Sequence, residues 1–192
     1  MRKILFALTI LLTLSFTEAT AQKEMTIDGV VLPRTIEFQK KKLWLNGAGN
    51  RSKMWVEVYV QALYLSQLGQ DPEFIIQSDT EMAMRIEITS SMVSSNKLTK
   101  AMNTGFEKSA GKDLEKLKPR IELFKSLLNE DIKEKDVFKL IYNPTDVSLW
   151  VYKNDLLKGK IPGFDFKKAF FGIWLSDLAV DAKLKDHLLG NG

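Results

Sequence analysis

The chain has 192 residues, 45% of them apolar, and its 28 basic and 24 acidic side chains leave a formal net charge of +4. This composition fits one domain with a sizeable core, and the mild charge, with lysines interspersed among acids or beside turns, argues against a nucleic-acid partner. There is no cysteine and a single histidine, His187. Disulfides, thiolate metal sites and cysteine nucleophiles are therefore excluded, and a Ser-His-Asp triad or a multi-histidine metal site is disfavoured.

The first residues follow the pattern of a secretory signal peptide. A basic start precedes an apolar run from Ile4 to Phe16, which is too short to span a bilayer, and the sequence ATA at 19–21 fits the small-residue cleavage site. We therefore expect a signal peptide at residues 1–21, a mature protein that begins at Gln22, and export to the periplasm or the medium without a membrane span. The alternative interpretation is a buried N-terminal helix.

Residues 22–192 are expected to form one α+β domain. Alternating apolar residues predict strands at 34–39, 43–45, 54–65, 82–89, 137–142, 147–152 and 156–161, and helical spacing predicts helices at 72–77, 96–110, 114–128, 166–178 and 180–189. The glycine-rich segment from Asn46 to Asn50 is predicted to be a tight turn, and Pro119 is expected to break or restart its helix. This order of elements favours a large antiparallel sheet with helices on one side.

The long strand at 54–65 has two different faces. One face is almost wholly apolar and is expected to lie in the core: Met54, Val56, Val58, Val60, Ala62 and Tyr64. The other face mixes aromatic and polar groups: Trp55, Glu57, Tyr59, Gln61, Leu63 and Leu65. Such a mixture is typical of a strand that forms the floor of a cleft.

Arg51 is the most informative candidate for a binding residue. It follows the predicted glycine turn, where the backbone can approach a ligand closely and a guanidinium can hold a carboxylate or phenolate through paired hydrogen bonds. Tyr59 lies on the mixed face of the next strand, and its hydroxyl is a candidate donor to the same anion. Each residue also has a structural interpretation, as an exposed arginine at a hairpin end and a half-buried strand tyrosine, and periodicity alone favours the structural one.

Two helical residues are further candidates. Asn103 lies in mid-helix beside the apolar stripe, where asparagine has poor propensity, so it either faces solvent or points into a pocket. Trp174 lies on the apolar helix at 166–178, where a core position is favoured over a ligand platform. The sequence contains no phosphate-binding loop, metal-spaced carboxylates or dinucleotide fingerprint, so we expect neither a cofactor nor a metal.

Five segments in order resemble the bacterial chalcone isomerase-like proteins: VVLPRTIEF (30–38), LNGAGNRSK (45–53), VEVYVQALYL (56–65), KAMNTGFEK (100–108) and FGIWLSDLAVDAKLKDHLLG (171–190). The resemblance covers essentially the whole mature chain. It implies an open-faced β-sandwich, in which a large antiparallel sheet carries a helical layer and a ligand lies in the cleft between them.

The resemblance also implies roles for individual residues. Arg51 matches the arginine that stabilises the substrate oxyanion in plant chalcone isomerases and holds the carboxylate in relatives that bind fatty acids. Asn103 matches a cleft asparagine, whereas a cleft tyrosine falls at Asn96, a threonine at Tyr59 and a late-helix hydroxyl residue near Gly172. Because the last three positions are changed, we expect no flavonoid cyclisation, but we expect capture of an anion.

Three functions remain open at this point. The favoured one is binding of a small amphipathic anion such as a fatty acid, with Arg51 and Tyr59 at the charged head and the apolar part lined by Met82, Met84, Met102, Phe106 and Trp174. The alternative is an isomerase or intramolecular lyase acting on an enone or phenolic substrate, with Arg51 as the electrostatic catalyst. The third is an interaction protein with a vestigial cleft. Neither the ligand nor the oligomeric state follows from the sequence.

Overall fold

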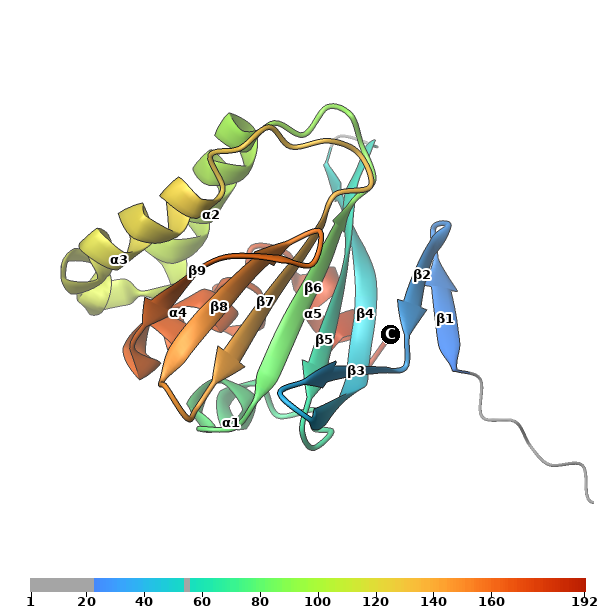
Figure 1. The fold of residues 1–192 in the computed structure, drawn as a ribbon, viewed down its shortest axis with the longest axis horizontal. Helices are drawn as coiled ribbons and strands as arrows, with labels where there is room; N and C mark the ends of the chain where they lie inside the picture. Colours follow the sequence, from blue (N-terminus) through green and yellow to red (C-terminus); the bar gives the residue numbers. More distant parts are fainter. Residues whose placement is uncertain (1–22, 54–55) are drawn as a thin grey trace, which may run out of the picture.

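A curled, seven-stranded antiparallel sheet with helices against one face forms the body of the molecule (Figure 1). The computed structural model describes residues 23–53 and 56–192. The predicted signal peptide, together with Met54 and Trp55, therefore lies outside the described residues. The strands follow one another in the sheet in chain order: β3 (Thr35–Phe38), β4 (Lys41–Lys53), β5 (Val56–Leu65), β6 (Met82–Ile88), β7 (Val137–Asn143), β8 (Ser148–Lys153) and β9 (Leu156–Pro162).

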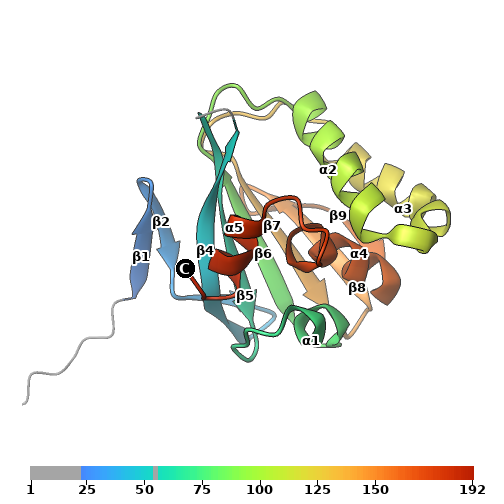
Figure 2. The ribbon, with the colours of Figure 1, turned by 180° about the vertical axis from the view of Figure 1, so that it is seen from behind.

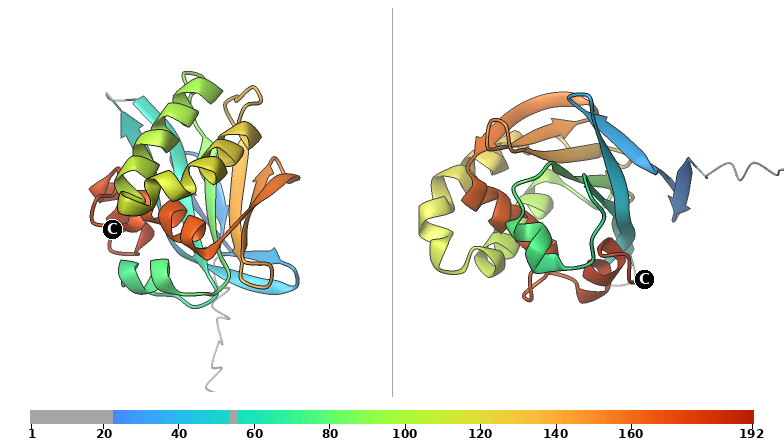
Figure 3. Two further views of the ribbon diagram at one scale, coloured as in Figure 1. Left: turned by 90° about the vertical axis from the view of Figure 1, so that its left-hand side faces the viewer. Right: turned by 90° about the horizontal axis from the view of Figure 1, so that it is seen from below.

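The helices gather on one face of this sheet, as the views from behind and from below show (Figures 2 and 3). They are α1 (Pro72–Gln77), α2 (Ser95–Ser109), α3 (Leu114–Leu127), α4 (Phe164–Leu175) and α5 (Ala182–Leu188), with a short 3-10 turn at Gly111–Asp113. Capping side chains fix several helix starts, because they accept hydrogen bonds from otherwise unpaired backbone amides. Asp71 caps α1, Ser94 caps α2 and Asp181 caps α5.

The main core fills the space between the sheet and the helices. Aromatic rings from three helices pack there at centroid distances of 5.3–6.4 Å: Phe106, Phe124, Phe166, Phe170, Phe171 and Trp174. Apolar side chains of β5 to β9 form the other wall of this core. These contacts confirm the predicted α+β class, with a large antiparallel sheet and a helical layer.

A second, smaller core lies on the opposite face of the sheet. There a two-stranded hairpin of β1 (Glu24–Ile27) and β2 (Val30–Pro33) packs its buried Val30 and Leu32 against Val60, Ala62 and Tyr64 of β5. This hairpin was not expected from the sequence, and it lies outside the curl of the sheet (Figure 3). The hairpin covers the apolar face of β5, while Tyr59, Leu63 and Leu65 of the mixed face lie in the main core, so β5 is buried on both faces.

The predicted turn at 46–50 is wrong, because these residues lie within the continuous strand β4. The two glycines serve close packing instead. A Cβ atom at Gly47 would lie 2.1 Å from the carbonyl oxygen of His187, and one at Gly49 would lie 2.9 Å from the His187 side chain. The glycines therefore let the C-terminal helix α5 rest directly on the strand.

The predicted break at Pro119 is also wrong, because α3 continues through this residue. Proline lacks the amide that would donate to the carbonyl of Glu115 one turn earlier. Both residues are exposed, so water can satisfy the carbonyl and the helix persists. The other predicted strands and helices all occur, with ends that differ by a few residues.

Candidate functional site

Three predicted site residues lie together on the helix side of the sheet. Arg51 of β4 and Tyr59 of β5 are directly paired across the two antiparallel strands, so their side chains share one face. Trp174 approaches from α4, and its indole N–H donates a hydrogen bond to the Tyr59 hydroxyl oxygen at 3.1 Å. Tyr59 is 7% exposed and Trp174 is 1% exposed, so the Arg51–Tyr59–Trp174 cluster sits at the edge of the core.

The electrostatics of the cluster keep Tyr59 a hydrogen-bond donor. Burial raises the pKa of Tyr59, and the hydrogen bond from Trp174 and the charge of Arg51 oppose that rise only in part. The hydroxyl is therefore neutral at physiological pH. Its oxygen already accepts the indole proton, and within the described residues its own proton has no acceptor. That proton is available to a ligand.

Arg51 is held by a carboxylate of the same chain. Its Nη1 donates to Oδ2 of Asp181, the capping residue of α5, and both side chains are only partly exposed, at 27% and 20%. The other carboxylate oxygen of Asp181 accepts the backbone N–H of Leu184 at 3.0 Å. Asp181 therefore caps α5 and also pairs with the Arg51 guanidinium, which fixes the start of α5 beside the cluster.

Asp181 is a site residue that sequence analysis missed. The two candidate asparagines do not join the cluster. Asn96 is exposed in the first turn of α2 and Asn103 is half-buried two turns later, and neither hydrogen-bonds to the cluster. Their role as ligand contacts stays a prediction. The proposed lining residues Met82, Met84, Met102 and Phe106 share the main core with Tyr59 and Trp174.

Gln61 extends the same face of β5 by two residues. It pairs with Gly49 on one side and with Ile86 on the other, and it is completely buried. Within the part of the chain that the structure describes, neither its amide nitrogen nor its amide oxygen has a hydrogen-bond partner. An uncompensated polar side chain in such a position is uncommon in a folded protein and calls for an explanation.

Two grooves open on the outer side of α4, away from the cluster. One, of about 240 Å³, lies between α1, α4 and the C-terminal end of α2, and a second, of about 620 Å³, adjoins it around Leu175 to Leu178. The hydroxyl groups of Ser109 and Ser176, which line both grooves, are buried without a hydrogen-bond partner in the described residues. Their walls do not include Arg51, Tyr59 or Trp174.

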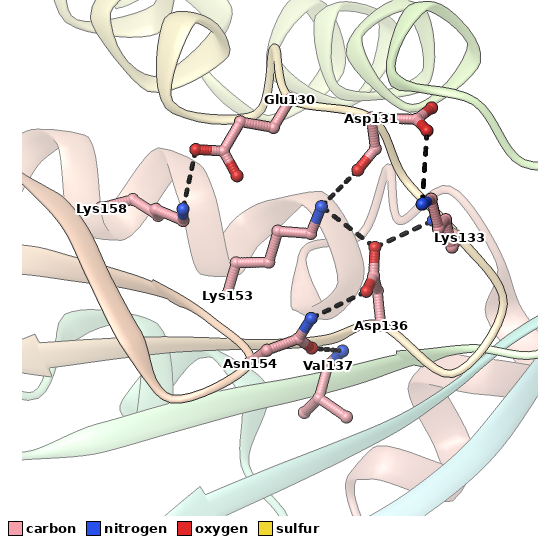
Figure 4. Close-up of polar contacts among 8 residues, drawn as sticks. All are labelled: Glu130, Asp131, Lys133, Asp136, Val137, Lys153, Asn154 and Lys158. Atoms are coloured by element: carbon pink, nitrogen blue, oxygen red, sulfur yellow. Dashed lines mark hydrogen bonds and ion pairs between the residues drawn. The ribbon is translucent and has the colours of Figure 1, made fainter.

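A polar network of lysine, aspartate and asparagine side chains joins two connecting segments of the fold. Lys153 lies against Asp136 at 3.0 Å and donates to the backbone carbonyl of Asp131, while Asn154 donates to the same Asp136 side chain at 2.8 Å (Figure 4). Although burial acts to raise it, the bonds from Asn154, the Lys133 amide and Lys153 hold the pKa of Asp136 below its usual value. The network ties the loop between α3 and β7 to the turn between β8 and β9.

Metal-ligand clusters and membrane-spanning helices are both absent from the described residues. In residues 23–53 and 56–192, no three histidine, aspartate or glutamate side chains gather as a metal ion would require. Over the same ranges, each helix is too short or too polar to cross a bilayer.

The fold of the chain matches a solved structure, and its sequence matches a known protein family. The fold matches the crystal structure of a fatty-acid binding protein from Arabidopsis thaliana with a TM-score of 0.70 at 16% sequence identity, over 88% of this chain and 96% of that one. No curated protein sequence matches the chain. The family profile described as chalcone isomerase-like matches residues 24–190, most of the chain. The chain therefore belongs to the chalcone isomerase-like family.

Proposed function

We propose that this protein binds a small amphipathic carboxylate, such as a fatty acid, with its head group at Arg51 and Tyr59. The observation that carries the proposal is the ion pair of Arg51 with Asp181. Beside it, the hydroxyl proton of Tyr59 has no acceptor within the described residues. The guanidinium is placed to take a carboxylate, and a hydroxyl donor stands next to it. The similar Arabidopsis structure is that of a fatty-acid binding protein, which supports the same ligand class.

The ligand carboxylate has two ways to reach Arg51. It can displace Asp181, or it can use the remaining guanidinium nitrogens, since only Nη1 is hydrogen-bonded within the described residues. Displacement would free the start of α5, because Asp181 also caps that helix. Release of α5 would open a path from the cluster toward the apolar side chains beneath it, where the tail of the ligand would lie.

A titration with myristate tests the proposal. Arg51→Ala should weaken binding about ten- to a hundredfold, because a charge-assisted contact contributes roughly 1.5–3 kcal/mol. Arg51→Lys should restore only part of the affinity, since an ammonium cannot make the forked contact. Arg34→Ala is the matched control, because the Arg34 side chain has no ion pair within the described residues. Equal affinity for Arg51→Ala and the wild type would reject the proposal.

We also propose that the protein is exported, on the strength of the signal-peptide pattern in residues 1–21. N-terminal sequencing of material from the periplasm or the medium should begin at Gln22. Native mass spectrometry of the same material should show a co-purifying fatty acid if the site is filled in the cell. Retention of Met1 in exported material would reject the cleavage proposal without bearing on ligand binding.

A further inference from the structure

Gln61 is a buried amide that the fold itself does not use. Its side chain is completely buried, and neither polar atom has a partner in the described residues. Burial of an amide without hydrogen bonds is unfavourable for folding. The next residues on the same face, Leu63 and Leu65, are apolar and equally well buried, so an apolar side chain suits this row. Gln61 therefore weakens the core at a position where packing does not require an amide.

The position of Gln61 connects it to the proposed head-group site. It follows Tyr59 by two residues on the same strand face, a separation of about 6.6 Å along the strand. Its cross-strand neighbour Gly49 lies beneath the His187 side chain of α5, and α5 rests against β4 and β5 (Figure 2). A ligand held at Arg51 and reaching under α5 would pass this amide.

The chemistry of the unpaired groups indicates what such a ligand carries. The amide offers two N–H donors on its nitrogen and an acceptor oxygen beside it. A carboxylate accepts hydrogen bonds only, so it would satisfy a donor and leave the acceptor unpaired. A hydroxyl group both donates and accepts and can satisfy one donor and the acceptor together. We propose that Gln61 recognises a hydroxyl group on the acyl chain, so that the preferred ligand is a hydroxylated fatty acid; this rests on the carboxylate site proposed at Arg51 and Tyr59.

The test compares β-hydroxymyristate with myristate by calorimetric titration. The wild type should bind the hydroxylated acid about tenfold more tightly, as expected for one well-formed neutral hydrogen-bond pair. Gln61→Met keeps the length of the side chain and removes both polar groups. It should lower the affinity for β-hydroxymyristate about tenfold, leave that for myristate unchanged, and not lower the melting temperature of the free protein. Gln61→Leu is a second variant with the same expected result.

The control is Gln67→Leu, which removes an exposed glutamine just beyond β5 and should preserve the preference. Equal affinities of the wild type for both acids, combined with weaker binding of both by Arg51→Ala, would overturn the role of Gln61 and leave the carboxylate site standing. A preference that survives in Gln61→Met, or a lower melting temperature with the preference intact, would also overturn it. If the wild type bound neither acid, both proposals would fail together.

Discussion

Replacement of Asp181 by asparagine should make the protein bind a fatty acid more tightly. In the free protein the Asp181 carboxylate occupies Arg51, so a ligand carboxylate has to compete with it. The side chains are 27% and 20% exposed, which places the pair between a surface ion pair and a buried one, and we take its contribution as about 1 kcal/mol. Asparagine still caps a helix well, so α5 should keep its start while Arg51 loses its internal partner.

Removal of this competition should raise the affinity for myristate about fivefold, because each 1.4 kcal/mol corresponds to a factor of ten. The free energy of unfolding of the free protein should fall by about 1 kcal/mol. Isothermal titration calorimetry and urea unfolding measure the two effects separately. Asp186→Asn, on an exposed residue of the same helix, is the control and should change neither. Unchanged or weaker binding by Asp181→Asn would refute the competition between the two carboxylates.

Four further predictions concern the fold and the site. Lys167→Met should lower the free energy of unfolding, measured by urea denaturation, by about 2–4 kcal/mol. The reason is that the buried ammonium donates to three backbone carbonyls at the end of α1 at 2.7–3.1 Å. A loss below about 1 kcal/mol would contradict this. Since burial lowers the pKa of Lys167 to about 7, the unfolded state binds more protons between that pH and about 10. The free energy of unfolding of the wild type should therefore include a contribution that rises with pH across this window, and the Lys167→Met variant should lack this contribution. Equal pH dependence of the two proteins would reject the lowered pKa of Lys167. Gly47→Ala should destabilise the protein by about 1–3 kcal/mol, because the new Cβ would meet the His187 carbonyl at 2.1 Å. A melting temperature equal to that of the wild type would contradict this and show that α5 shifts freely. A 2′-hydroxychalcone should cyclise no faster with the protein than in buffer, and a saturable rate lost in Arg51→Ala would promote the isomerase hypothesis.

Elements whose patterns are local could be predicted from the sequence. The helix α1 has its own start signal in Asp71 and Pro72, and the structure shows the cap and the first turn there. The strands β7, β8 and β9 are separated by turn residues close to where they were expected. In each case the residues that decide the structure lie within a few positions of one another.

The failures involve partners far apart in the chain. Glycine suits both a tight turn and close packing, and the element that packs on Gly47 lies 140 residues later, so the local sequence could not choose between them. Asp181 was also missed, because its capping role is local but its partner Arg51 lies 130 residues earlier in the chain. Tyr59 and Trp174 were proposed separately, and only the fold shows that they share a hydrogen bond.

The helix α5 and the seven-stranded sheet are held in place by different contacts. The helix has seven residues, and within the described residues two hydrogen bonds join it and its capping residue to β4, from Arg51 to Asp181 and from Asn46 to the carbonyl of Leu188. The seven-stranded sheet, by contrast, is continuous from β3 to β9. Short peripheral elements open at a much smaller free-energy cost than a central sheet. Because Leu184 and Leu188 of α5 are buried in the main core, movement of the C-terminal segment would uncover that core, while every strand of the sheet would keep its neighbours.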